Sequence, residues 1–336
     1  MTNVQLHAAV VAKIHALRAK LLKPSDYDRL MKTDNLVGSL RQWYPQLPPT
    51  GGIFELELAL LDEFQEQIEP IYLYYGFGYR QILKRVFMRF EVERIKLALR
   101  AITTHDESLH PRIPRSHMLS NVDEERFIKA KTYGELADAM LYPPYRKAIL
   151  DMKDIEQNPL FHAEMTLDKE YFRGLVDLKD YLEELDMEIM IEAVGVQVDL
   201  LNINWIRRAK ATFKITPEEI FNYTISRGKR IGIRQQRTLS YMTLEQLDAW
   251  IAQSPYHEVF DGNPLGQDAR IERYLYQTMR SLEKAHPMSI APVITYLHEI
   301  EYQMRDLDMI VEARDYQVDV SQELFGKQVG AWRSKK

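Results

Sequence analysis

The sequence predicts an all-α fold made of three related helical units, and two observations lead to that prediction. Only 14 of 336 residues are glycine and 15 are proline, while Leu, Glu, Ala, Lys, Arg and Met, which favour helix, recur throughout. Residues 202–210, which lead into residues 215–221, have a copy 104 positions later (306 − 202), and a weaker copy lies 108 positions earlier (202 − 94). Copies at a near-fixed period indicate a repeated structural unit.

A second marker supports the same period. Each unit opens with a short helical phrase that closes on a tyrosine, at residues 36–44, 136–145 and 247–256. Chance similarity between leucine-rich amphipathic helices is the alternative explanation, but two markers in the same order favour repetition. We therefore divide the chain into residues 1–122, which include an N-terminal helix, residues 123–234 and residues 235–336.

The first unit reads as a series of helices separated by proline and glycine. Apolar residues at three- and four-residue spacing predict a helix over residues 6–22, which Pro24 ends, and Ser25 is expected to cap a helix over residues 26–31. Three prolines and two glycines make residues 45–52 a loop. A helical pattern then runs over residues 53–102, with a break near residues 75–78.

The other two units follow the same plan. Residues 103–121, with two prolines, read as the crossing into the second unit, and a long helix is predicted over residues 175–194. Residues 261–266 form a loop in the third unit, and the last four residues form a basic tail.

Overall charge and composition disfavour several classes of protein. The net charge is −5, so the chain lacks the polycationic character that binds nucleic acid by counterion release. The absence of cysteine excludes disulfides and thiolate metal sites and fits a reducing cytoplasm. No run of 18 apolar residues and no signal peptide is found. We expect a soluble, cytoplasmic chain without a membrane span that reaches a membrane only through a partner and is monomeric in isolation.

Charge is distributed unevenly within the second unit. Residues 177–199 carry eight acids and one lysine, a net −7, whereas residues 205–237 carry nine bases and two acids, a net +7. The two stretches could neutralise each other or form solvated faces, because surface ion pairs are common and individually weak. Alternatively, the basic stretch docks an acidic partner. The candidate docking residues are Arg227, Lys229, Arg230 and Arg234.

Motifs that could carry catalysis are weak. Two Glu-x-x-His phrases, beginning at Glu107 and Glu283, suggest a di-metal carboxylate site, which needs both residues on one intact helix. Each histidine, His110 and His286, precedes a proline, however, and such residues usually mark a helix end. The glycines around Phe77 match a turn better than a dinucleotide fingerprint, and no phosphate-binding loop is present. We expect no enzyme activity, no cofactor and no metal.

Three polar residues occupy equivalent places in the repeated phrases: Arg94, Asn202 and Asp306. Polar side chains within otherwise apolar helices could hold a ligand along a shared axis. They could equally be hydrogen-bonded contacts between helices, as most buried polar groups are.

Several phrases also resemble a known family, the C subunits of the bacterial and archaeal V-type (A/V-type) ATPases, which are the counterparts of the eukaryotic d subunit. The phrases are residues 11–27, 202–208, 216–220 and 287–301. The resemblance implies three helical repeats about a pseudo-threefold axis, forming a funnel-shaped body. It also implies a non-catalytic coupler between the central-stalk subunits of the soluble ATPase head and the membrane rotor ring.

Two other classes of protein share some of these features. A helical-repeat scaffold that binds a protein or nucleic acid would show periodicity, but such repeats are usually shorter, about 20 to 50 residues. A di-metal carboxylate enzyme would share the helices and the acidic phrases.

Overall fold

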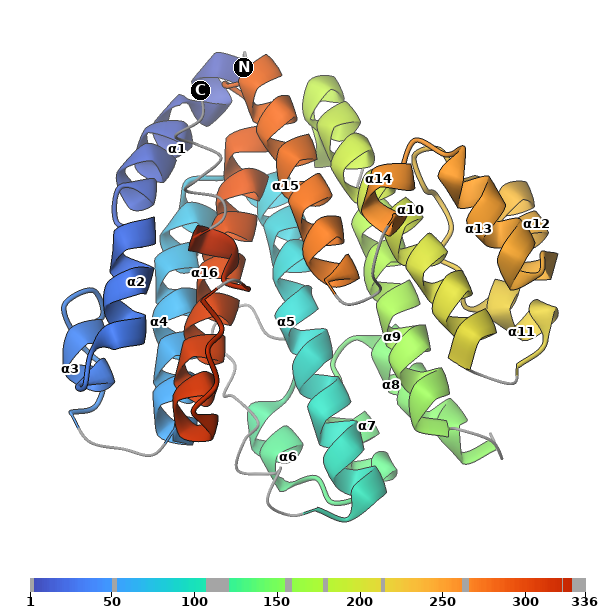
Figure 1. The fold of residues 1–336 in the computed structure, drawn as a ribbon, viewed down its shortest axis with the longest axis horizontal. Coiled ribbons are helices and arrows are strands. Elements are labelled where there is room, and N and C mark those ends of the chain that lie inside the picture. Colours follow the sequence, from blue (N-terminus) through green and yellow to red (C-terminus); the bar gives the residue numbers. More distant parts are fainter. Residues whose placement is uncertain are drawn as a thin grey trace. The chain divides into compact units, whose positions relative to one another are not determined.

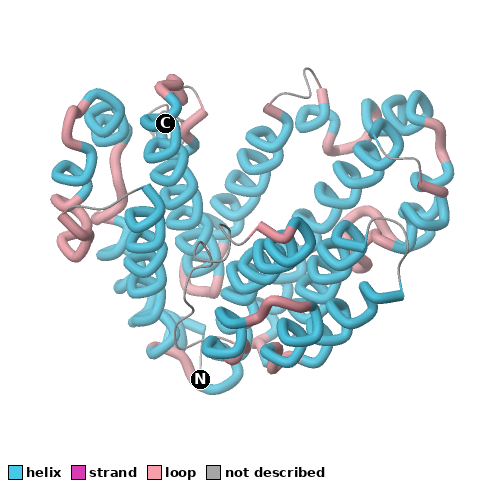
Figure 2. The backbone as a smooth tube through the Cα atoms, turned by 90° about the horizontal axis from the view of Figure 1, so that it is seen from below, coloured by secondary structure: helices cyan, strands magenta, loops and turns pink. Residues whose placement is uncertain are grey.

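The computed structural model describes residues 3–49, 53–106, 121–154, 159–177, 181–212, 215–261, 266–321 and 323–327. Within these ranges the secondary structure is helical, and the only β-type pairing is an isolated bridge between Val122 and Met140 (Figure 1). The predicted all-α fold class is confirmed. Figure 2, coloured by secondary structure, shows helices joined by short loops and turns.

The chain divides into two compact units, residues 1–76 with 279–336, and residues 77–278. The first unit brings the beginning and the end of the chain together. Its helices are α1 (Asn3–Arg18), α2 (Pro24–Lys32), α3 (Leu36–Leu40), α4 (Ile53–Leu73), the last turns of α15 (Gln267–Ala285), and α16 (Ala291–Tyr316). Helix α16 packs on both α1 and α4, so residues from the beginning and from the end of the chain share one core.

The second unit contains the middle of the chain. Its helices are α5 (Phe77–Thr104), α6 (Glu124–Lys129), α7 (Tyr133–Ala139), α8 (Pro143–Leu150), a 3-10 turn η2 (Asp151–Asp154), α9 (Pro159–Val176), α10 (Glu184–Thr212), α11 (Pro217–Asn222), α12 (Ile233–Tyr241), α13 (Leu244–Ala252), α14 (His257–Phe260) and most of α15. Helix α9 contacts both α5 and α10 (Figure 1).

The direction of α9 relative to α5 follows from three side-chain contacts. Lys96 binds Asp168, Arg100 binds Glu164, and the Tyr171 hydroxyl reaches the carbonyl of Val86. Residue numbers rise on one helix as they fall on the other, so α5 and α9 are antiparallel.

Helix α10 contributes several residues to the core of the second unit. Apolar residues spaced along it, among them Leu200, Ile203 and Ile206, are buried in a cluster that also includes Leu247 of α13 and Tyr256. Helix α10 is the one helix of the described chain long and apolar enough to cross a membrane. Because 67% of its most apolar stretch is buried within the protein, it equally matches the core helix of a globular protein.

The break expected near residues 75–78 agrees with the structure, because it falls between α4, which ends at Leu73, and α5, which begins at Phe77. The helix predicted over residues 6–22 ends earlier, at Arg18, and the next helix begins at Pro24, two residues before its predicted start. Ser25 therefore lies inside this helix and does not cap it. The N-cap is Lys23, whose backbone N–H donates to Asp26 Oδ2 at 2.8 Å, because a proline at the first helical position places the cap one residue earlier.

The predicted helix over residues 175–194 is wrong. Helix α9 ends at Val176 and α10 begins at Glu184. No proline or glycine interrupts the apolar spacing there, so the pattern alone does not reveal the break. The first turn of α10 carries Glu184 and Asp186, and carboxylates at a helix N-terminus interact favourably with the helix dipole.

Candidate functional site

The repeat-equivalent residues Arg94 and Asn202 are buried, and each joins a long helix to the segment that follows it. Arg94 on α5, 5% exposed, donates two hydrogen bonds to the Glu124 carboxylate at 2.9 and 2.8 Å. Asn202 on α10 is 1% exposed. Its side-chain amide donates to the Ile225 carbonyl and accepts from the Ile225 N–H, both at 2.8 Å. Both side chains are therefore occupied by contacts within the protein.

Asp306 on α16 does the same for the C-terminal segment. One carboxylate oxygen accepts from the backbone N–H of Phe325 at 2.8 Å and the other from that of Gly326 at 2.6 Å. The Tyr27 hydroxyl is a third partner. Burial raises the pKa of Asp306 to about 6, although these hydrogen bonds lower it.

A second set of polar residues, which sequence reasoning missed, lies one helical turn earlier. Glu91, Asp199 and Gln303 are separated by the same two offsets, 108 (199 − 91) and 104 (303 − 199). Each is buried, and each accepts a hydrogen bond from a backbone N–H far away in sequence. The donors are Asn121 for Glu91 at 2.5 Å, Arg230 and Ile231 for Asp199 at 2.7 and 3.1 Å, and Leu22 for Gln303 at 2.7 Å.

The tyrosines that close the predicted opening phrases lie beside this second set. Gln303 donates to the Tyr44 hydroxyl at 2.6 Å, and the Tyr256 hydroxyl donates to Asp199 at 2.7 Å. Burial raises the pKa of Tyr145, and the nearby Glu91 carboxylate raises it further. The sequence signal that could have revealed the second set is the offset of 108 or 104 between its members, but each member is a different residue type.

The basic loop, residues 227–231, carries three of the four candidate docking residues and is fixed on α10. Asp199 accepts from two of its backbone amides, and the Lys229 N–H donates to the Gly195 carbonyl at 3.1 Å. A Cβ at residue 195 would lie 2.9 Å from the Lys229 nitrogen, so glycine is what allows the loop to approach the helix. The loop presents its charged side chains from a rigid support.

The four docking candidates differ in their surroundings. Arg227 lies 3.6 Å from Asp177, and Lys229 forms an ion pair with Glu192, so two basic residues meet acids of the neighbouring acidic stretch. Arg230 and Arg234 are exposed and make no ion pair within the described residues. The basic surface is thus partly neutralised at Arg227 and Lys229 and open at Arg230 and Arg234.

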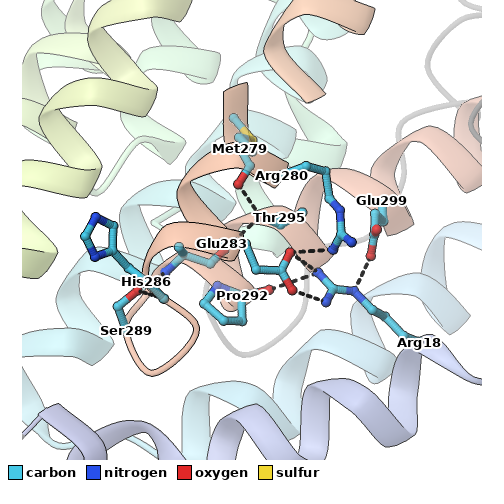
Figure 3. A network of polar contacts seen from close by, with 10 residues as sticks. Arg18, Met279, Arg280, Glu283, His286, Ser289, Pro292, Thr295 and Glu299 are labelled. Atoms are coloured by element: carbon cyan, nitrogen blue, oxygen red, sulfur yellow. Dashed lines mark hydrogen bonds and ion pairs between the residues drawn. The ribbon is translucent and has the colours of Figure 1, made fainter. Parts of the chain in front are cut away.

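Glu283, considered above as a metal ligand, is bound by two arginines instead (Figure 3). Arg18 of α1 forms a two-pronged ion pair with the Glu283 carboxylate and donates from Nε to Glu299 of α16 at 2.5 Å. Arg280 donates to Glu283 at 2.7 Å. The side chains of these two ion pairs are nearly buried, with exposed fractions of 12% for Arg18, 10% for Glu283 and 4% for Glu299.

His286 does not bind Glu283. Helix α15 ends at Ala285, so His286 lies outside the helix, as its following proline indicated (Figure 3). The first Glu-x-x-His phrase, at Glu107 and His110, lies outside the described residues. Within the part of the chain that the structure describes, no group of three or more His, Asp or Glu side chains could hold a metal ion.

These features define a class of all-helical protein in which buried polar side chains fasten long helices to distant segments and a basic loop is held on the surface. Comparison with known proteins assigns the chain to a family. A family model described as ATP synthase (C/AC39) subunit matches residues 10–322. The chain belongs to this family, and the resemblance seen in its sequence is confirmed.

Individual relatives are distant but cover nearly the whole length. The C subunit of the A-type ATP synthase of Methanosarcina barkeri is 20% identical over 95% of this chain and 91% of its own. The corresponding protein of Pyrococcus horikoshii is 24% identical over 90% of this chain and 84% of its own. That of Archaeoglobus fulgidus is 22% identical over 86% of each.

Proposed function

We propose that the chain is a non-catalytic subunit of an A/V-type ATP synthase. It would couple the central stalk of the soluble head to the membrane rotor ring and transmit rotation for proton or sodium transport. The family match over residues 10–322 carries the proposal, and relatives named as the C subunits of A-type ATP synthases align over most of their length. The chain would then be cytoplasmic and held at the membrane through its partners.

We also propose that the body consists of three units around a pseudo-threefold axis, in the funnel shape that the family resemblance implies. The support comes from contacts made by the tyrosines that close the three predicted opening phrases. Tyr145 lies by Glu91 and Tyr256 binds Asp199, so the opening phrase of one predicted unit contacts the long helix of the unit before it. Tyr44, from the first predicted unit, binds Gln303 of the last. This third contact would close the series into a ring.

Such closure suits a part that carries torque. A side chain that binds backbone amides fixes the position of the chain itself, and buried polar networks are rigid when every member is satisfied. Asp199, Asn202 and Gln303 each bind backbone groups of segments far away in sequence. Rotation applied at one surface would reach another with little internal deformation.

The basic loop and the start of α12 are the proposed docking surface for an acidic partner. Arg230 and Arg234 would contribute most, because Arg227 and Lys229 already have acidic neighbours within the chain. Complementary charge mainly directs and orients association, and screening by salt weakens it.

The coupling role is tested with the assembled complex and with a complex that lacks this chain. We expect the soluble head to hydrolyse ATP in both cases, while ATP-driven ion pumping by membrane vesicles stops without the chain. Pumping at the normal rate in its absence would refute the coupling role.

The docking surface is tested separately. Arg230→Glu with Arg234→Glu should weaken assembly, most strongly at low ionic strength, because salt screens the charge interaction that the variant reverses. The matched control is Arg126→Glu with Lys129→Glu on α6, which makes the same charge change at exposed positions. Equal effects of the two pairs, or none, would discard this surface and leave the coupling role untouched.

A further inference from the structure

A cavity within the second unit has features of a ligand site. It has a volume of about 260 Å³ and lies between α5, α9 and α10, beside the segment that follows α11. This volume is near the lower end of the range for small-molecule pockets, about 300 to 1,000 Å³. The residues of α10 that line it include Gln197, Leu201, Trp205 and Arg208, which are spaced by three to four residues and share one helix face.

One wall of the cavity is aromatic and already fixed. The Trp205 indole N–H donates to the Ile220 carbonyl at 3.3 Å. Its ring meets Tyr223 edge-on at 6.2 Å and Phe161 at 5.1 Å between ring centres. The wall therefore needs no rearrangement to receive an apolar group.

The charged groups around the cavity favour an anion. Lys96 binds both acids of the lining, Asp168 at 2.6 Å and Glu93 at 3.0 Å, so these carboxylates are already partnered. With Arg89 and Arg208 the lining carries three bases and two acids, a net +1. Arg208 makes no hydrogen bond or ion pair to any other described residue, so its guanidinium can bind a carboxylate.

A side-chain amide without a hydrogen bond to a described residue also lines the cavity. Gln197 is 8% exposed and lines the cavity, yet its side chain forms no hydrogen bond to a described residue. Asn202 beside it, by contrast, is fully paired with Ile225. The Gln197 amide, which can both donate and accept, is therefore available to a bound molecule.

We propose that this cavity binds a small organic anion with an apolar body. Its carboxylate would bind Arg208, and its apolar part would lie against Trp205, Tyr223 and Leu201. A polar group at the far end would bind Gln197. The proposal concerns the isolated chain and does not depend on the coupling role.

The probe is 3-phenylpropionate, titrated by calorimetry into the full-length protein. Acetate, which lacks the apolar body, and 3-phenylpropan-1-ol, which lacks the charge, are compared with it. We expect one saturable site with a dissociation constant of about 1 mM or tighter, and affinity at least about tenfold lower for each comparison compound.

Three variants locate the binding site. Arg208→Met should weaken binding of 3-phenylpropionate about tenfold by removing the charge-assisted hydrogen bonds, and Leu201→Trp should abolish it by filling the cavity. The matched control, Arg234→Met, removes an exposed arginine of the same unit that does not line the cavity. Absence of saturable binding, or binding that neither Arg208→Met nor Leu201→Trp changes, would overturn the proposal.

Discussion

Removal of Arg18 should destabilise the first unit by about 3 to 5 kcal/mol, the usual cost of breaking a buried ion pair from one side. Arg18 binds two carboxylates that are themselves nearly buried, Glu283 and Glu299. In Arg18→Met these two acids lose a shared cation, while Arg280 continues to bind Glu283. The loss should therefore fall toward the lower end of the range, measured by urea denaturation of the full-length chain.

A charge-neutral variant separates electrostatics from packing. Glu283→Gln and Glu299→Gln, added to Arg18→Met, remove the uncompensated carboxylates and should recover most of the lost stability, since neutral replacement of a whole buried ion network is often tolerated. A stability deficit below about 1 kcal/mol in Arg18→Met, or one that the two glutamines do not reduce, would refute the reasoning.

Variants of Asp306, Gly228 and Gly232 test two further contacts. Because Asp306 has a folded pKa of about 6, well above its unfolded value, it stabilises the fold below about pH 4, and this contribution is lost as pH rises through 6. Urea denaturation should show the free energy of unfolding of the wild type falling by about 2 to 3 kcal/mol relative to that of Asp306→Asn between pH 4 and 7.5. A difference that stays constant over this range would contradict the raised pKa of Asp306. Gly228→Ala places a Cβ 1.9 Å from Asp199 Oδ1 and should cost about 1 to 3 kcal/mol. Gly232→Ala, where nothing lies within 4 Å, should change stability by less than about 1 kcal/mol, and equal effects of the two alanines would show that the loop is not fastened as described.

Much of the helical fold could be predicted because its signals are local. The segment before Phe77 marks a helix boundary that the structure confirms, and Pro24 lies within two residues of the predicted start of α2. The boundary between α9 and α10 was missed because no proline or glycine marks it. Deviations of this kind arise where tertiary contacts, such as the hydrogen bond from Tyr79 to Asp186, decide where a helix begins.

The candidate site was harder to predict because its contacts are distant in sequence. Arg18 and Glu283 are 265 residues apart, and Asp199 reaches Tyr256 across 57 residues. Each member reads as an ordinary helical residue when taken alone. The phrase around Glu283 even suggested a metal ligand, since a Glu-x-x-His spacing carries no sign of the arginine that the fold supplies.

Glu91, Asp199 and Gln303 show how positions at the predicted repeat offsets can share a role without sharing a residue type. Their side chains differ in length and charge, yet all three offer an sp² oxygen that accepts from a backbone N–H. What recurs at offsets of 108 and 104 is therefore a hydrogen-bonding role and not a residue type. An acidic side chain performs it with a negative charge that must be compensated by donors when buried, and Asp199 has three, two backbone amides and the Tyr256 hydroxyl. Gln303 carries no charge and can donate as well as accept, so its amide serves the Leu22 N–H and the Tyr44 hydroxyl together.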